Sequence, residues 1–251
     1  IVDLPTFGAD SGFEATFQFT VADAAALRGA QLALELPELY KISINGTAVD
    51  FVGAERWLDP HLNSVPVESL LKVGDNVVRL TGVPFDVRME LENIYVRGNF
   101  SVEADTRGFV LRAPRTLAVG SWAKQGFPFY SDSVLYEARV DVPKRSRSLR
   151  VSFPAWQGSV AEVLLDGKPI QTVGWQPYLI ETPITPGAHT VGVRIVATPR
   201  NLFGPFHNRT KPRMIAWPGA WQGFPDHQPA GAQYDLLDYG LMEAFHVEAL
   251  R

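Results

Sequence analysis

The sequence predicts an all-β protein built from two tandem antiparallel β-sandwich modules. Three observations lead to this prediction: apolar and polar residues alternate over strand-length segments, Asn-Gly and Asp-Gly dipeptides mark tight turns, and the elements recur in one order in both halves. A side-chain period of two is typical of a strand with one buried face. Sustained helical periodicity is nearly absent, and the best short helix, 23–28, lies where a surface turn is expected.

The first two repeated elements are strands. Residues 13–19 alternate aromatic and polar side chains, and residues 136–142 repeat that alternation with the same Glu-Ala step. A second strand follows in each half, at 31–37 and 149–154, and both segments end at proline. Because proline has no amide hydrogen to donate to a ladder, each strand is expected to end there.

Matched turn chemistry is the third repeated feature. The segments 41–46 and 162–167 end in Asn45-Gly46 and Asp166-Gly167, respectively. These dipeptides tolerate the positive φ angles of a type I′ turn, so both segments are predicted to enter β-hairpins.

Two further elements complete the repeat. The fourth element is a turn that leads into a strand, at 71–80 in the first half and 184–193 in the second. The fifth is a final strand, at 99–104 and 244–249. Five pairs in the same order favour a duplicated sandwich of the jelly-roll kind over a single barrel. The boundary is expected near residue 106, which gives modules at 1–106 and 107–251.

Composition fits a folded protein and argues against two classes of partner. Of the 251 residues, 46% are hydrophobic and 20% charged, unlike the polar signature of disorder. The formal net charge of −4 gives no electrostatic reason to expect nucleic acid or an anionic membrane. The short basic run at 144–150 is typical of a solvated strand edge or turn. No apolar stretch approaches the roughly 20 residues of a membrane span.

The cysteine count is zero, which excludes disulfides, thiolate metal sites and a cysteine nucleophile. The chain begins Ile1-Val2-Asp3, without an initiator methionine or the layout of a signal peptide. We therefore expect an excised fragment or a mature form.

Three stretches resemble a known enzyme family. They are LENIYVRGNF at 91–100, GSWAKQGFPFYS at 120–131 and RNLFGPFH at 200–207. They resemble non-catalytic modules of bacterial family 106 α-L-rhamnosidases and related family 2-like enzymes, and the strand–hairpin–turn order resembles galactose-binding-like jelly rolls. The resemblance implies a C-terminal part of a larger polysaccharide-degrading enzyme, extracellular or periplasmic, whose catalytic (β/α)₈ barrel lies elsewhere. It implies two partners, namely that catalytic domain and a plant or algal polysaccharide or oligosaccharide.

Catalysis within this chain is not expected. A glycosidase needs two carboxylates on opposite sides of the scissile bond. The candidate acids lie within strands or at repeat-matched strand ends, which suits a structural role: Glu14, Glu103, Glu137, Glu162 and Glu248. The five histidines show no close metal-ligand spacing, and the sequence contains no nucleophile elbow, phosphate loop or dinucleotide fingerprint.

Binding is the favoured function, because the second module is longer than the first by roughly 30 residues between its last two matched elements. A sugar ring stacks its C–H face on an aromatic side chain while planar polar groups bind its hydroxyls. This insertion, about 199–233, supplies five ligand-binding candidates: Arg200, Asn201, His207, Trp217 and Trp221. The alternative is that its aromatic residues fill a lid over the core or the seam between modules.

Three more ligand-binding candidates lie outside the insertion. Trp122 and Tyr130 belong to an aromatic cluster just after the predicted boundary, which could line a groove or pack the modules together. Trp175 follows the second hairpin. The comparable segment of the first module offers only Trp57 and His61, so the second module is predicted to be the binder.

No cofactor is expected, although a structural calcium ion remains possible. Carbohydrate-binding jelly rolls often hold calcium through loop carboxylates, and Asp10, Asp235 and Asp238 are possible ligands. Ordinary turn or capping roles are the alternative for these three residues. Two functions thus remain open: a carbohydrate-binding or accessory module pair, and structural modules that pack against a catalytic barrel. A glycosidase in its own right ranks last.

Overall fold

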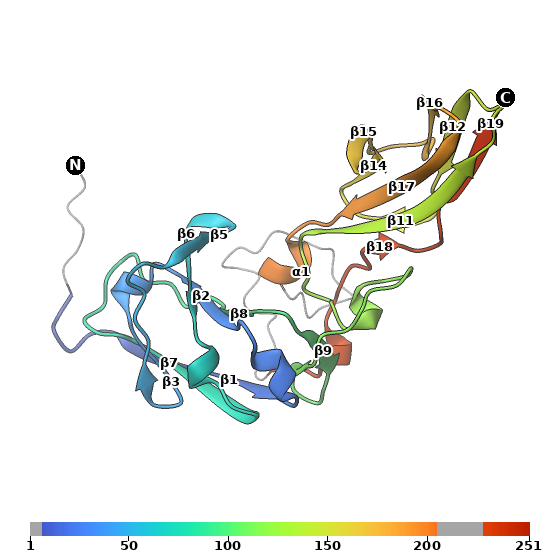
Figure 1. Cartoon of the computed structure of the whole chain (residues 1–251). Coiled ribbons are helices and arrows are strands. Elements are labelled where there is room, and N and C mark those ends of the chain that lie inside the picture. Colours follow the sequence, from blue (N-terminus) through green and yellow to red (C-terminus); the bar gives the residue numbers. More distant parts are fainter. Residues whose placement is uncertain (1–6, 205–227) are drawn as a thin grey trace, which may run out of the picture. The chain divides into compact units, whose positions relative to one another are not determined.

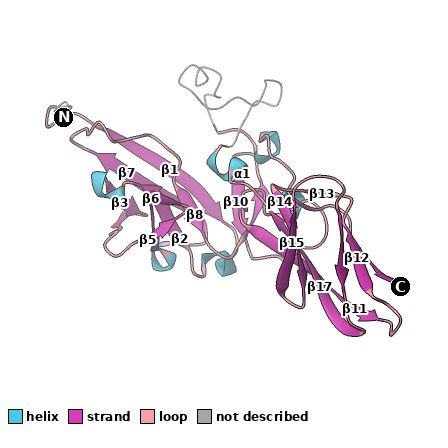
Figure 2. Cartoon of the chain, turned by 90° about the horizontal axis from the view of Figure 1, so that it is seen from above, coloured by secondary structure: helices cyan, strands magenta, loops and turns pink. Residues whose placement is uncertain are grey.

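The computed structural model describes residues 7–204 and 228–251, which divide into two compact units (Figure 1). Unit 1 comprises Ile1–Arg115 and Gln228–Ala232, and unit 2 comprises Thr116–His227 and Gln233–Arg251. The predicted all-β class is confirmed, since strands dominate both units and the helices are single turns (Figure 2). The division falls after Arg115 rather than at residue 106, because strand β10 (Phe109–Arg112) pairs with two other strands of unit 1.

Unit 1 contains two sheets. The six-stranded sheet has the order β4-β3-β7-β1-β10-β9 and the four-stranded sheet the order β5-β6-β2-β8. The remaining strands are β1 (Phe13–Val21), β2 (Gln31–Glu35), β3 (Lys41–Ile44), β4 (Thr47–Ala48), β5 (Glu55–Trp57), β6 (Asp59–Pro66), β7 (Gly74–Gly82), β8 (Tyr95–Arg97) and β9 (Ser101–Ala104). Inward-facing residues of both sheets form the core: Leu32, Leu34, Ile42, Ile44, Val65, Val78 and Leu80.

Unit 2 repeats this plan with one sheet of four strands, β11-β17-β14-β15, one of three, β16-β12-β19, and a short pair, β13-β18. The strands are β11 (Ser133–Val142), β12 (Ser148–Ser152), β13 (Trp156–Gln157), β14 (Val160–Leu165), β15 (Lys168–Val173), β16 (Leu179–Pro183), β17 (Gly187–Val196), β18 (Gly240–Leu241) and β19 (His246–Leu250). Its core includes Trp122, Leu149, Phe153, Val163, Val193 and Ile195.

The helices are short connectors. They are η1 (Ala24–Leu27), η2 (Pro37–Leu39), η3 (Glu68–Leu70), η4 (Ala123–Gln125), α1 (Arg200–Phe203) and η6 (Gly231–Gln233). The helix expected at 23–28 is the single turn η1. Within the described ranges, no helix is long and apolar enough to cross a membrane.

The predicted hairpin turns are confirmed. Asn45 and Gly46 have φ angles of 50° and 85°, and Asp166 and Gly167 have φ angles of 49° and 77°. These values are the left-handed backbone conformation that a type I′ turn requires at both central positions. One turn joins β3 to β4 and the other joins β14 to β15, so the turn occupies the equivalent place in each unit.

Four of the five predicted element pairs occupy equivalent positions, and the fifth does not. Strand β19 pairs with β12, whereas β9 pairs with β10 in the other sheet of its unit. The neighbour of β2 that corresponds to β19 is β8, and the strand that corresponds to β16 is β6. Alternating patterns reveal which face of a strand is buried but not which neighbour it pairs with, so the sequence matched the wrong strand here.

Candidate functional site

The loops at one end of unit 2 bring aromatic side chains together. The loop after β12 and the loop between β15 and β16 are joined by a hydrogen bond from the Phe153 amide to the Tyr178 carbonyl at 3.0 Å. The rings of Trp156 and Tyr178 meet edge to face, with centroids 5.3 Å apart and planes at 74°. Trp175 lies on the same loop as Tyr178 and is 81% exposed. We call the residues 153–159 and 174–178 the aromatic loop end.

Polar groups accompany these rings. The indole Nε1 of Trp156 is buried and has no hydrogen-bond acceptor among the described residues. A buried donor without a partner costs roughly 1–3 kcal/mol, and because this nitrogen is buried it is not available to a ligand at the surface. Gln157 and Gln176 are exposed on the same two loops, and each side-chain amide can donate and accept hydrogen bonds.

Trp122, in contrast, has no surface for a ligand. It is 0% exposed, lies in the core of unit 2, and donates through Nε1 to the Tyr136 hydroxyl at 2.7 Å. Tyr130 packs edge to face against it, with ring centroids 5.7 Å apart, and is itself 38% exposed. Trp122 therefore packs in the core and does not make the expected ligand contact. Burying its apolar rings is more favourable than exposing them to water.

The side chains of Arg200 and Asn201 bind other residues of unit 2. Arg200 pairs with the Asp235 carboxylate through Nη2 at 3.0 Å. The Asn201 amide donates to the carbonyls of Pro128 and Leu237, both at 2.9 Å, and accepts the Leu237 amide hydrogen at 2.9 Å. With Asn201 only 1% exposed, its hydrogen-bonding capacity is used inside the protein. The structure thus directs both predicted ligand residues toward internal partners.

The remaining predicted ligand residues, His207, Trp217 and Trp221, lie outside the described residues. Of the eight candidates, Trp175 is the one among the described residues that presents most of its ring to solvent.

Two of the possible calcium ligands have other partners. Asp235 pairs with Arg200, and Asp238 accepts a hydrogen bond from Ser121 Oγ at 2.5 Å and lies 3.6 Å from the Lys124 ammonium. Asp10 lies in an exposed turn. The position of Asp10 matches the turn alternative, whereas Asp235 and Asp238 have side-chain partners in place of the expected turn or capping roles.

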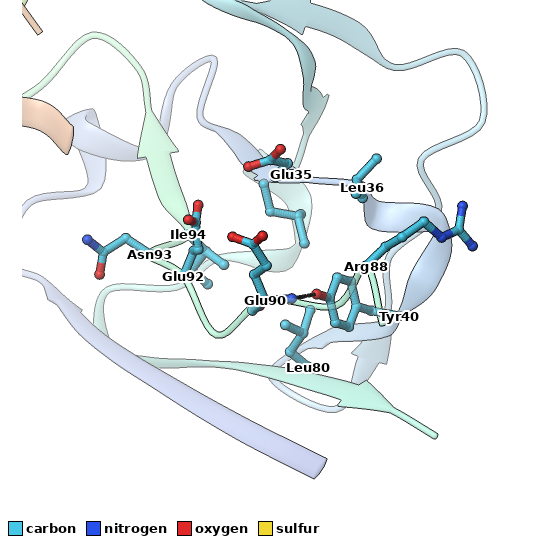
Figure 3. A pocket seen from close by; sticks show the side chains of 10 residues that line it. Glu35, Leu36, Tyr40, Leu80, Arg88, Glu90, Glu92, Asn93 and Ile94 are labelled. Carbon is cyan, nitrogen blue, oxygen red and sulfur yellow. Dashed lines mark hydrogen bonds between the residues drawn. The ribbon is translucent and has the colours of Figure 1, made fainter. Parts of the chain in front are cut away.

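Unit 1 contains a pocket that the sequence did not reveal. Four apolar side chains, Leu34, Leu36, Leu80 and Ile94, form part of its wall, while polar groups come from β2, from the end of η2 and from the loop before β8. Figure 3 shows the side chains of Glu35, Glu90 and Glu92 extending toward the same region. We call this the acidic pocket.

A tyrosine holds the loop that supplies two of these acids. The Tyr40 hydroxyl donates to the Glu90 carbonyl at 3.1 Å and accepts the Glu90 amide hydrogen at 3.0 Å (Figure 3). The adjacent cation, Arg88, is paired with Asp86 through two hydrogen bonds of 2.9 and 2.8 Å. The acids therefore lie in a fixed loop whose nearby arginine is already paired.

Burial and crowding alter the ionisation of these groups. Desolvation, followed by hydrogen bonding and repulsion from Glu90 and Glu35, raises the pKa of Glu92 to about 7. Desolvation, with the negative charge of Glu92 and Glu35, raises the pKa of Tyr95 to about 12. Desolvation also raises the pKa of Tyr40. A neighbouring proton or cation would relieve this crowding.

The signal for this pocket was present in the sequence but weak. Glu90 and Glu92 alternate with Leu91 just before β8, which is the pattern of side chains on one side of an extended segment. Glu35 is far from them in sequence and becomes their neighbour only because β2 pairs with β8. Sheet order, which no local pattern encodes, creates the site.

Comparison with known proteins gives no match among protein-family models or curated proteins and several matches among solved structures. A rhamnosidase from Novosphingobium sp. PP1Y matches over 94% of this chain and 21% of its own, with 18% identity and a TM-score of 0.36. A β-D-mannosidase from Dictyoglomus thermophilum matches over 64% of this chain and 22% of its own, with 15% identity and a TM-score of 0.31.

A glycosyl hydrolase family 2 member from Bacteroides cellulosilyticus DSM 14838 also matches, over 73% of this chain and 23% of its own. Its identity is 7% and its TM-score 0.24. The chain thus spans about a fifth of the length of each of these glycoside hydrolases.

Proposed function

We propose that the chain is a non-catalytic carbohydrate-binding module pair of an extracellular or periplasmic polysaccharide-degrading enzyme, and that the aromatic loop end of unit 2 contacts the glycan. The observation that carries this proposal is the 81% exposure of Trp175. Burying a large aromatic side chain stabilises the folded state by roughly 1.5–3 kcal/mol. The exposed indole of Trp175 does not contribute this stabilisation within its own chain. A sugar face stacked on the indole would recover part of it.

Polar side chains of the aromatic loop end suit a sugar better than an apolar ligand. Gln157 and Gln176 offer amide groups that can bind adjacent hydroxyls as donor and acceptor. Rings that cover C–H faces beside planar polar groups form the combination that a pyranose requires.

Binding to immobilised or soluble polysaccharide tests this proposal. Affinity electrophoresis and calorimetry with rhamnogalacturonan and ulvan fragments would compare the parent chain with Trp175→Ala and Trp175→Phe. We expect at least a tenfold loss of affinity for Trp175→Ala and a smaller loss for Trp175→Phe, which keeps an aromatic face.

Ile170→Ala is the matched control, because Ile170 is an exposed apolar residue on the adjacent strand β15 but not in the loop. It should bind as the parent does. Equal affinity of the parent and Trp175→Ala, or no binding of any of these glycans by the parent, would contradict the proposal.

A structural role is the second candidate, and the full burial of Trp122 and Asn201 favours it. In this case Trp122 and Asn201, which were expected to contact a ligand, stabilise the fold, and Trp175 contacts the catalytic domain. Acrylamide quenching separates the two functions: in the full-length enzyme without glycan, an indole docked on the catalytic domain is shielded, whereas a glycan-binding indole stays accessible until sugar is added.

A further inference from the structure

A second group of side chains in unit 1 has the composition and spacing of a metal site. Glu35, Asp59 and His61 each offer one ligand atom, and these atoms all lie within 4.8 Å of one another. Asp59 Oδ1 and His61 Nδ1 are 3.5 Å apart. From these distances we propose that Glu35, Asp59 and His61 bind a divalent transition-metal ion, with zinc as the best fit.

Strand pairing assembles the three ligands. Glu35 ends β2, and its register partner on β6 is Leu62, which directly follows His61. The Leu36 amide donates to the His61 carbonyl at 3.1 Å and fixes the two strand ends side by side. Asp59 and His61 are two residues apart on β6, a spacing that places both side chains on one face of a strand.

The observed distance matches zinc coordination. Ligand bonds of about 2.1 Å in a tetrahedral arrangement place neighbouring donor atoms roughly 3.4 Å apart. The 3.5 Å between Asp59 and His61 agrees with that value. All three residues are exposed, so small side-chain rotations can bring Glu35 to the same separation.

The donor types favour zinc over calcium. Zinc accepts both imidazole nitrogen and carboxylate oxygen as ligands, whereas calcium takes oxygen ligands. Three protein ligands leave a fourth position for water or for an oxygen atom of another molecule.

The acidic pocket adjoins this group and shares Glu35 with it. Glu90 and Glu92 add carboxyl groups beside Glu35. In the part of the chain that the structure describes, no lysine, arginine or histidine lies within ion-pair distance of Glu35, Glu90 or Glu92. Negative charge without a paired side chain raises the local affinity for a metal cation.

Calorimetric titration of the chelator-treated chain with zinc chloride tests this proposal. We expect one site per chain, a rise in melting temperature on adding zinc, and affinity for zinc at least tenfold above that for calcium. His61→Ala and Glu35→Gln should each weaken zinc binding at least tenfold. Trp175→Ala should leave zinc binding unchanged, so this proposal and the proposed glycan site fail separately.

His246→Ala is the control for loss of an exposed imidazole, because His246 lies on β19 of unit 2. It should bind zinc as the parent does. Zinc affinity that is equal in the parent and His61→Ala, or that falls equally in His61→Ala and His246→Ala, would overturn the assignment. Calcium binding that is tighter than zinc binding would overturn the choice of metal.

Discussion

His189 lies between two acceptors, with Nδ1 2.7 Å from the Asp166 carboxylate and Nε2 2.9 Å from the Thr185 carbonyl. An imidazole that faces an acceptor at each nitrogen is best satisfied when both nitrogens carry hydrogen. Asp166 also accepts the Thr190 amide hydrogen at 2.8 Å. The contact therefore fastens the β14–β15 turn to the start of β17 in unit 2.

This pair predicts a pH dependence of stability. Hydrogen bonding to Asp166, then to Thr185, raises the pKa of His189 above its ordinary 6.5. Its stabilising contribution is therefore complete below about pH 6.5 and is lost as the pH rises through the raised pKa. Hydrogen bonds from Thr190 and His189 lower the pKa of Asp166 below its ordinary 3.8, so its contribution is lost only in stronger acid.

We expect the melting temperature of the parent to fall as the pH rises above about 6.5, and that of His189→Gln to change less. Glutamine retains hydrogen bonding without titrating. His246→Gln, which removes an exposed histidine elsewhere in unit 2, should follow the parent curve. Parallel curves for the parent and His189→Gln would contradict this assignment.

The acidic pocket also predicts a loss of stability with rising pH, here from a carboxyl group. The pKa of Glu92 is raised to about 7 in the folded protein, mainly by desolvation and next by Glu90. The folded state then holds a proton that the unfolded state releases near pH 4.5, so stability falls as the pH rises from about 4.5 to 7. The loss is smaller than the shift alone suggests, because the group is partly exposed.

Glu92→Gln should therefore be more stable than the parent at pH 8 and should differ little from it at pH 4. Urea unfolding at the two pH values in metal-free buffer measures this difference. Glu243→Gln is the control, because Glu243 is exposed and lies in unit 2, outside the pocket. A Glu92→Gln protein that is less stable than the parent at pH 8 would refute the prediction.

Local patterns predicted what local physics controls. The Asn45-Gly46 and Asp166-Gly167 turns follow from backbone sterics, and the strands that end before Pro37 and Pro154 follow from a missing amide hydrogen. Strand identity and the two-unit repeat were recoverable for the same reason.

The sites depended on contacts between distant segments and were therefore only partly predictable. Trp175 and Trp122 are both tryptophans in loop-like sequence, yet one is exposed and the other is wholly buried. The difference arises from the hydrogen bond to Tyr136 and from the surrounding core, neither of which a local window contains. Histidine spacing likewise gave no indication of the group around His61, because its third member, Glu35, comes from another strand.

The hydrogen bonds of Asn201 predict that its substitution lowers the free energy of unfolding but does not change glycan affinity directly. Asn201→Ala removes four hydrogen bonds, to the Pro128 and Leu237 carbonyls and from the Leu237 amide and the Arg200 guanidinium, so we expect about 2–4 kcal/mol of destabilisation. Asn93→Ala, an exposed substitution in unit 1, should cost less than about 0.5 kcal/mol. Denaturant unfolding measures both, and glycan affinity of folded Asn201→Ala should equal that of the parent.

Substitutions of Trp122 and Trp175 should have different effects on stability and on fluorescence quenching. Trp122→Ala removes a fully buried indole from the core and should destabilise unit 2 by about 3–5 kcal/mol, whereas Trp175→Ala should change stability by less than about 0.5 kcal/mol. Tyr136→Phe removes the hydroxyl that accepts hydrogen bonds from Trp122 Nε1 and the Leu241 amide, and should cost about 1–3 kcal/mol. In acrylamide titrations, Trp175→Ala should lose a readily quenched component of the fluorescence, and Trp122→Phe should lose a protected one. If the two substitutions removed equally quenchable components, the contrast between a packing indole and a binding indole would fail.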